Sequence, residues 1–221
     1  MANQYGPRIV TSGLVLYLDA GNSKSYPGTG TAWNDLSGNG NNGTLLNGPT
    51  YTSDYKGGII LDGVNDYVGM SIVSSVPIEG PGTLDVWGSY AAVSSTYNLI
   101  SLSLDTLGIQ VGILGGNGIV WKYGGSTLLS YTKPTINTIT NWTLTFNGAN
   151  LIMYINGILN NSTTTAANQT GSSPIIRLGT YNAGASQPLN GRIYTSKIYN
   201  RVLTSSEILQ NYNATKGRYG L

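Results

Sequence analysis

Short apolar runs recur along the whole chain, and each run is followed by Gly, Asn or Pro within a few residues. They comprise Leu14–Leu18, Ile59–Leu61, Tyr67–Met70, Leu84–Trp87, Leu99–Leu102, Ile109–Leu114, Ile119–Tyr123, Leu128–Tyr131, Trp142–Phe146, Leu151–Ile155, Ile175–Gly179 and Arg192–Tyr199. Runs of this length bounded by turn residues are typical of β-strands. The pattern therefore predicts about a dozen short strands and an all-β fold.

Two Asn-Gly dipeptides give the clearest local signal. Asn147-Gly148 and Asn156-Gly157 flank the run Leu151–Ile155. Both residue types tolerate positive φ, which tight hairpin turns require. The segment from Trp142 to Asn161 is therefore predicted to form consecutive antiparallel strands.

A single helix is predicted near the C-terminus, over Leu203–Tyr212. Thr204 can cap this helix while Glu207, three residues later, returns the hydrogen bond, and Leu203 can pack on Ile208 as a hydrophobic staple. The alternative role of Glu207, that of a catalytic acid, is disfavoured because capping-box glutamates are ordinarily structural. The residues expected to pack on the sandwich are Ile208, Leu209 and Tyr212.

The domain organisation follows from the absence of any linker, repeat or low-complexity segment. Residues 1–221 are expected to form one domain, with an N-terminal arm at 1–12, the short helix at 204–213 and a C-terminal tail at 214–221. The ends are expected either to attach the domain to neighbouring subunits or to pack on it through Tyr5, Tyr219 and Leu221. The Gly- and Asn-rich segment Trp33–Thr44 is expected to be an ordered loop, a flexible loop or an ion-holding turn.

Composition narrows the classes of partner. The chain has 31 glycines and only 9% charged residues, which disfavours an α/β enzyme. The absence of cysteine excludes disulfides and thiolate metal sites. A formal net charge of +2 predicts no nucleic-acid partner, and no apolar run is long enough to predict a membrane span. The first eight residues lack a signal-peptide pattern, so we expect use without classical secretion.

Several segments in one order carry a resemblance to a known family. They are Gly13-Leu14-Val15-Leu16-Tyr17-Leu18-Asp19, Trp33-Asn34-Asp35-Leu36-Ser37-Gly38-Asn39-Gly40, Leu61-Asp62-Gly63-Val64-Asn65-Asp66-Tyr67, Leu151-Ile152-Met153-Tyr154-Ile155-Asn156-Gly157, and Gly191-Arg192-Ile193 through Glu207-Ile208. Together they resemble the concanavalin A-like superfamily, and within it the laminin-G-like jelly rolls frequent in phage and bacterial surface proteins. The resemblance implies a two-sheet antiparallel jelly-roll sandwich, with looser matching over Ser71 to Lys133.

Catalysis is not expected. Superfamily members that hydrolyse polysaccharides carry a Glu-x-Asp-x-x-Glu pattern on one strand, whereas this chain has only two glutamates, Glu79 in a Pro/Gly loop and Glu207 in the helix cap. The absence of histidine removes a Ser-His-Asp relay and an imidazole base. We therefore predict no catalytic residue and no enzyme activity.

Calcium is the one cofactor for which the sequence offers candidate ligands. Carboxylates at Asp19, Asp35, Asp62 and Asp66, with the backbone at 38–43, offer oxygen ligands. Many relatives carry an acidic pair where this chain has Tyr194-Thr195, which weakens a calcium site. Asp19, Asp35 and Asp62 are instead predicted to accept backbone hydrogen bonds in turns, and no metal ligand, cofactor-binding residue or cofactor is assigned.

Aromatic side chains are candidates for stacking on sugar rings. Trp33, Trp121 and the many tyrosines belong to this group. The competing and stronger interpretation places strand aromatics such as Trp87, Trp142 and Tyr154 in the core.

The leading functional hypothesis is a non-enzymatic virion structural protein, either a capsid decoration or cement subunit or a head or tail fibre module. It would be assembled in the host cytoplasm, exposed on the particle surface, and partnered by the major capsid protein or other virion proteins. Cell-surface glycans and further copies of the chain are the other partners considered. The alternative is a lectin-like module that recognises cell-surface glycans, and a glycan hydrolase is the third and least favoured reading. Fold alone does not choose among them.

Overall fold

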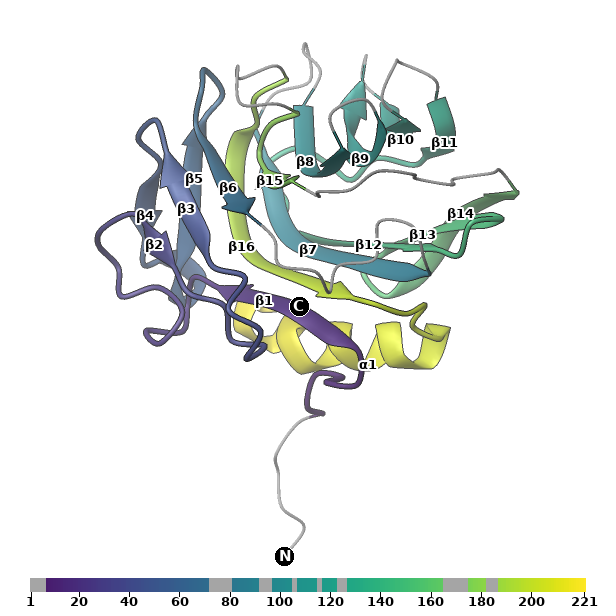
Figure 1. Ribbon diagram of the computed structural model, residues 1–221, viewed down its shortest axis with the longest axis horizontal. Coiled ribbons are helices and arrows are strands. Elements are labelled where there is room, and N and C mark those ends of the chain that lie inside the picture. Colours follow the sequence, from purple (N-terminus) through teal and green to yellow (C-terminus); the bar gives the residue numbers. More distant parts are fainter. Residues whose placement is uncertain are drawn as a thin grey trace, which may run out of the picture.

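Two antiparallel sheets pack face to face in the computed structural model of the chain (Figure 1). The described residues are 7–71, 81–91, 97–104, 107–114, 117–122, 127–164, 175–181 and 187–221. Glu79 lies outside them, as do Met1–Gly6 with Tyr5. The predicted all-β sandwich with one short C-terminal helix is confirmed.

The first sheet has the strand order β14-β13-β12-β7-β16-β5-β4, with β1 also paired to β16. Its strands are β1 (Leu14–Asp19), β4 (Thr50–Thr52), β5 (Gly58–Asp62), β7 (Gly82–Tyr90), β12 (Thr140–Phe146), β13 (Asn150–Ile155), β14 (Ile158–Thr164) and β16 (Asn190–Tyr199). β16 lies in the middle of this sheet, between β7 and β5. Strands from both ends of the chain therefore interleave, so the sheet forms only when distant segments meet.

The second sheet has the strand order β11-β10-β9-β8-β15-β6-β3-β2. Its strands are β2 (Ala32–Trp33), β3 (Gly43–Leu46), β6 (Tyr67–Ser71), β8 (Tyr97–Leu104), β9 (Leu107–Leu114), β10 (Asn117–Lys122), β11 (Thr127–Tyr131) and β15 (Ile175–Leu178). Apolar side chains from both sheets, among them Val68, Val111, Leu144 and Ile198, fill the space between them. This layer is the main core of the protein.

The turn between β13 and β14 has the geometry that its sequence predicts. Asn156 and Gly157 have φ of 54° and 76°, and β12, β13 and β14 pair consecutively and antiparallel. At the preceding turn, the Asn147 Oδ1 atom accepts hydrogen bonds from the backbone N–H groups of Ala149 and Asn150. The predicted run of antiparallel strands is confirmed.

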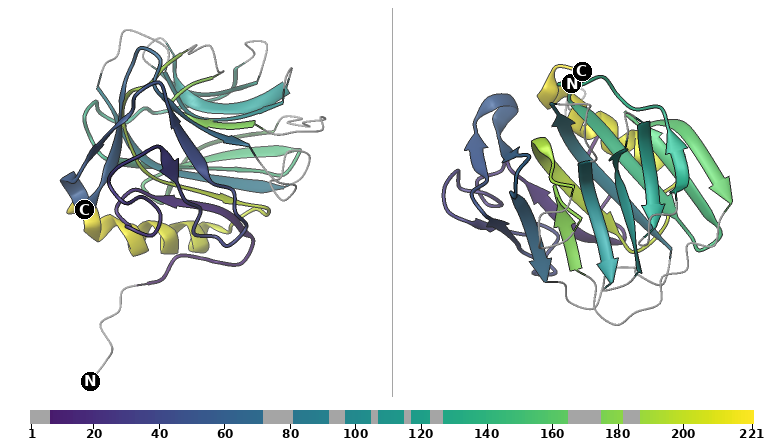
Figure 2. Two further views of the ribbon diagram at one scale, coloured as in Figure 1. Left: turned by 60° about the vertical axis from the view of Figure 1, so that its left-hand side comes forward. Right: turned by 90° about the horizontal axis from the view of Figure 1, so that it is seen from above.

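Helix α1 (Ser205–Lys216) lies across the outer face of the first sheet (Figures 1 and 2). Thr204 Oγ1 accepts a hydrogen bond from the Glu207 N–H, and Glu207 Oε2 accepts one from the Thr204 N–H, so the predicted capping box is confirmed. Leu203 and Ile208 share one buried cluster, as a staple requires. The prediction that Leu209 packs on the sandwich is wrong, since this residue is 44% exposed.

The C-terminal residues differ from the predicted tail at 214–221. α1 continues to Lys216, past the predicted end at residue 213, and a 3-10 turn, η2 (Gly217–Tyr219), follows. Tyr219 is buried against Trp87 and Tyr194, whereas Leu221 is exposed. The expected packing of Tyr219 on the domain is thus confirmed, whereas the predicted helix end at residue 213 and the packing of Leu221 are wrong.

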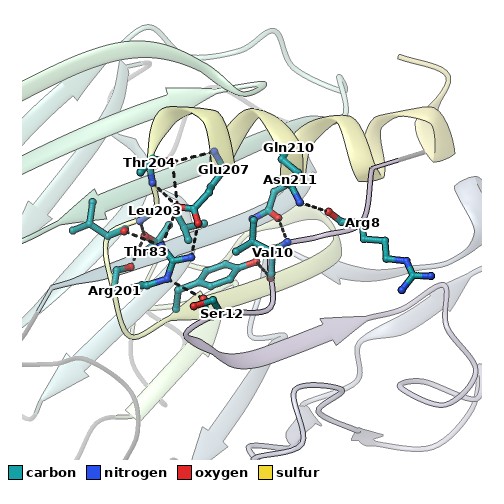
Figure 3. Close-up of polar contacts among 12 residues, drawn as sticks. Arg8, Val10, Ser12, Thr83, Arg201, Leu203, Thr204, Glu207, Gln210 and Asn211 are labelled. Carbon is teal, nitrogen blue, oxygen red and sulfur yellow. Dashed lines mark hydrogen bonds and ion pairs between the residues drawn. The ribbon is translucent and has the colours of Figure 1, made fainter. Parts of the chain in front are cut away.

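The described part of the N-terminal arm lies against α1 (Figure 3). The Val10 N–H donates to Asn211 Oδ1 over 2.8 Å, and the Tyr199 hydroxyl donates to the Val10 carbonyl over 3.0 Å. Gln210 Nε2 donates to the Arg8 carbonyl over 2.7 Å. The arm is therefore held through its backbone by side chains of the helix and β16.

A fully buried ion pair lies on the same outer face, among the strands that α1 covers. Lys197 Nζ on β16 is 2.7 Å from Asp85 Oδ1 on β7, and the two side chains are 0% and 1% exposed. Asn141 Nδ2 and the Thr143 hydroxyl donate to the other oxygen, Asp85 Oδ2. Charges this deeply buried are tolerated only when they are paired and hydrogen-bonded, as these are.

Candidate functional site

The tryptophans proposed as sugar-stacking residues do not form a site. Trp33 is 0% exposed within the core between the sheets, which contradicts its candidacy. Trp121 belongs to β10, but its side chain is not among those that the structure describes, so its candidacy stays a prediction. Trp87, Trp142 and Tyr154 are buried, which confirms the core interpretation. Trp87 lies beneath α1, where Tyr212 stacks on it at 5.5 Å between ring centroids.

The aspartates considered for calcium serve as hydrogen-bond acceptors in turns. Asp35 accepts from the backbone N–H groups of Tyr17, Ser37 and Asn41. The segment Trp33–Thr44, expected to be a loop, therefore contains an ordered loop at 34–42, with its two ends in β2 and β3. Asp19 accepts from the Gly21 N–H, and Asp62 from the Val64 N–H. The predicted turn roles of these three residues are confirmed. In the part of the chain that the structure describes, no three acidic residues gather as metal ligands would.

Glu207 is occupied by structural contacts (Figure 3). Its carboxylate lies 2.9 and 2.6 Å from the two terminal guanidinium nitrogens of Arg201, and it also accepts from the Thr204 N–H. The hydrogen bonds from Arg201, and then that from Thr204, lower the pKa of Glu207 to about 2. A carboxyl with this pKa holds no proton near neutral pH, so Glu207 is unsuited to act as a general acid.

One aromatic ring stands out on the surface. Tyr55 is 48% exposed, and no other Trp, Tyr or Phe among the described side chains is exposed to this degree. It lies in the 3-10 turn η1 (Asp54–Lys56), which connects β4 and β5. Its ring meets those of Tyr194 and Tyr219, with centroids 6.1 and 6.4 Å away. These contacts hold the ring, and about half of the residue stays exposed to solvent.

The backbone of η1 has an uncommon conformation. Tyr55 has φ 53° and ψ 35°, in the left-handed region that bulky residues rarely adopt. Such a conformation persists only where the surroundings enforce it, and it is commonest at functional sites. The exposed position of the Tyr55 ring therefore requires a backbone conformation of raised free energy.

Arg218, in η2, supplies the enforcing contacts. Its guanidinium donates to the carbonyls of Tyr55 and Gly57, each over 2.7 Å, and to the Asp19 carboxylate. Figure 2 shows the C-terminal turn beside η1. Gly21 leaves room for this arrangement, because a Cβ there would lie 2.2 Å from an Arg218 nitrogen. The C-terminal turn therefore fixes a loop that lies about one hundred and sixty residues earlier in the sequence.

Tyr55 borders a hollow of about 430 Å³, which we call the Tyr55 hollow. Its lining comes from the outer face of β5, β16 and β7, from η1, and from the connection before β12: Tyr55, Ile60, Leu61, Ser89, Ala91, Asn137, Ile139, Asn190, Gly191, Arg192 and Tyr194. The register between β16 and β7 shifts at Tyr194, as in a β-bulge, and bulges often redirect a side chain towards a site. Gly191 allows β16 and β7 to approach closely beneath the hollow, because a Cβ at this position would lie 2.1 Å from the Ser89 carbonyl oxygen.

Polar groups surround the ring. The exposed amide side chains of Asn137 and Asn190 make no hydrogen bond within the described residues, so their donors and acceptors are available. Arg192 contacts Asp54 over 3.4 Å, and both side chains are partly exposed. A ring for stacking, amides for hydroxyl groups and a guanidinium together suit a hydroxyl-rich ligand.

The sequence contains a signal for Tyr55 that the pattern of apolar runs conceals. Tyr55 is flanked by Asp54 and Lys56 and followed by Gly57-Gly58. A tyrosine between two charged residues and before two glycines is typical of an exposed turn. Its partners Arg218 and Tyr219 lie at the other end of the chain, so the hollow itself is not visible in the sequence.

These features define a class of protein: a two-sheet antiparallel jelly roll with an aromatic hollow on the outer face of one sheet. The family model described as Concanavalin A-like lectin/glucanases superfamily matches residues 62–209, which is more than half of the chain. The chain belongs to this family, of the laminin-G-like type. No curated protein sequence matches it.

Solved structures share the fold at low sequence identity. The binding domain of botulinum neurotoxin serotype D is 16% identical with a TM-score of 0.71, over 92% of this chain and 52% of that one. The binding domain of botulinum neurotoxin DC in complex with SialylT is 14% identical with a TM-score of 0.74, over 93% and 52%. A Trypanosoma rangeli sialidase with 2,3-difluorosialic acid is 13% identical with a TM-score of 0.74, over 98% and 37%. The chain thus spans about half or less of each of these structures.

In the part of the chain that the structure describes, no helix is long and apolar enough to cross a membrane.

Proposed function

We propose that this chain is a non-enzymatic carbohydrate-binding domain and that the Tyr55 hollow is its binding site. The observation that carries the proposal is Tyr55, the one exposed aromatic ring among the described side chains, held in a left-handed conformation at the edge of the hollow. An aromatic face packs well against the C–H face of a sugar ring, and the free amides of Asn137 and Asn190 match sugar hydroxyls.

The structural neighbours support the carbohydrate class. One is a neurotoxin binding domain whose complex contains SialylT, and another is a sialidase with a difluorinated sialic acid. Both share the jelly-roll fold with this chain. Their ligands make carbohydrates the first class of compound to test at the Tyr55 hollow.

The absence of catalysis is the second part of the proposal. Hydrolysis of a glycosidic bond needs two opposed carboxylic groups, and the chain lacks the Glu-x-Asp-x-x-Glu pattern that its hydrolytic relatives are expected to carry. Glu207 is bound to Arg201 and to the helix cap. Replacing Glu79 and Glu207 together by Gln should leave glycan binding unchanged, with a modest loss of stability. Release of reducing ends from a polysaccharide by the wild type would contradict the proposal, and loss of that release in this variant would assign it to the glutamates.

The binding proposal is tested first on a glycan array and then by calorimetry with the strongest binder. Tyr55→Ala should weaken binding about fivefold to tenfold, since an aromatic contact contributes about 1–1.4 kcal/mol. Tyr55→Phe retains the ring and should bind nearly as wild type. Ile158→Ala, which trims an exposed apolar residue on β14 at the opposite edge of the sheet, is the matched control.

Two results would refute this assignment. An array without any binder would remove the carbohydrate function. A folded Tyr55→Ala variant with wild-type affinity would place the binding site elsewhere.

Attachment to a virus particle stays a prediction from the family resemblance. Mass spectrometry of purified particles tests it, with copy number measured relative to the major shell protein. A copy number like that of the shell protein would indicate a capsid decoration subunit, and a handful of copies would indicate a fibre or tail component. Particles that lack the polypeptide would exclude the prediction.

A further inference from the structure

We propose that the Tyr55 hollow selects sugars that carry a carboxylate, with Arg192 binding the carboxylate group. This inference rests on the proposed carbohydrate function and adds the chemical class of the ligand. Arg192 is the only charged residue among those that line the hollow, so the lining itself is cationic.

The guanidinium of Arg192 is largely unengaged. Within the described residues it makes one contact, to Asp54 Oδ2 at 3.4 Å, and the two side chains are 37% and 57% exposed. A strong charge-assisted hydrogen bond is shorter, at about 2.7–2.9 Å. Arginine has five N–H donors in a planar fork that matches a carboxylate through two parallel bonds. Most of these donors are therefore available to a ligand.

Two other charged groups nearby are already occupied, and the third, Lys56 next to Tyr55, is exposed and does not line the hollow. Arg218 is bound to Asp19 and to the carbonyls of Tyr55 and Gly57. Asp62, opposite Asn190 in the sheet, accepts from the Val64 and Asn65 N–H groups. Asp54 is thus the main competitor for Arg192, and an exposed pair of this kind is weak. A ligand carboxylate can replace Asp54 at little cost.

The arrangement of ring and cation adds a geometric argument. Arg192 extends from β16 and Tyr55 from η1, and both border the same hollow with Asn137 and Asn190. A sugar that stacks on Tyr55 can then place a ring substituent at the guanidinium while its hydroxyls meet the amides. A neutral sugar offers the guanidinium only hydroxyl groups and no opposite charge, so it should bind the same site more weakly.

The test is calorimetry with matched pairs of ligands: oligogalacturonate against its methyl ester, and sialyllactose against its methyl ester. The acidic member of at least one pair should bind wild-type protein about tenfold more tightly than the neutral member. This preference should narrow as ionic strength rises, because the contact is partly exposed to solvent. Sulfated lactose serves as a third anion.

Two variants separate the role of charge from that of the ring. Arg192→Gln should remove the preference by weakening the acidic member far more than the neutral member, whereas Tyr55→Ala should weaken both members to a similar extent. Asp54→Asn should tighten binding of the acidic member about twofold to threefold, because it removes the competing carboxylate and its repulsion. Lys24→Gln, which removes an exposed cation outside the hollow lining, is the control and should keep the preference.

The outcomes are distinct. Equal binding of acidic and neutral members, a preference that survives Arg192→Gln, or preference for the sulfated sugar alone would overturn the carboxylate assignment while carbohydrate binding stands. Binding of neither member of any pair, together with an empty glycan array, would overturn the proposed function and this inference with it.

Discussion

Replacing Lys197 by Met should destabilise the protein more than almost any other change of a charged residue. Lys197 Nζ and Asp85 Oδ1 are 2.7 Å apart, and the side chains are 0% and 1% exposed, so no solvent replaces a lost partner. Removing one member of a buried pair costs about 3–5 kcal/mol. We expect a value of about 3 kcal/mol, because Asn141 and Thr143 still donate to the remaining carboxylate.

The assay is urea denaturation within a double-mutant cycle. Asp85→Leu should cost about as much as Lys197→Met, and the double variant should cost no more than either single variant, since no unpaired charge remains buried. Arg192→Gln breaks the exposed pair with Asp54 and serves as the comparison, with an expected loss below about 1 kcal/mol. A loss of that small size for Lys197→Met, or single effects that simply add, would refute the reasoning.

Three further predictions concern the helix and the C-terminal turn. Thr204→Ala should cost about 1 kcal/mol in urea denaturation, because it removes the capping hydrogen bond, and a wild-type midpoint would contradict this. Glu207, whose pKa falls from 4.5 to about 2 on folding, should contribute stability that is present above pH 4.5 and lost as the pH falls towards 2. Glu207→Gln should accordingly show a flatter acid limb in pH-dependent thermal melts, and identical limbs would argue against the Arg201 contact. Arg218→Ala should release the η1 turn, weaken glycan binding and lower the melting temperature, because it also removes the ion-pair partner of the largely buried Asp19. Wild-type affinity in the folded variant would show that the turn does not support the site.

Local signals in the sequence were sufficient for the parts of the fold that neighbouring residues determine. Asn156-Gly157 adopts the two positive φ values that its residue types favour. Thr204 and Glu207 form the capping box that their spacing predicts. In both cases the interacting groups lie within a few residues of each other, so the sequence pattern already contains the geometry.

Contacts between residues that are far apart in the sequence cannot be predicted from local patterns. The sequence predicts a helix end at residue 213, whereas the helix continues to Lys216. The residues after the helix are fixed by the burial of Tyr219 against Trp87 and Tyr194, which belong to other strands, so a local pattern does not contain this contact. Lys197 falls within an apolar run and gave no signal of its buried partner Asp85, 112 residues away. Tyr55 is one tyrosine among 16, and its conformation depends on contacts with Arg218 from the other end of the chain.

The central claim is that a carbohydrate binds at the Tyr55 hollow. The most direct measurement is a nuclear magnetic resonance titration of isotope-labelled protein with the strongest binder from the glycan array. We expect chemical-shift changes concentrated at Tyr55, Asn137 and Arg192, with the amide resonance of Leu159 on β14 unchanged. Shifts confined to β14 or to the second sheet, with these three residues unaffected, would contradict it.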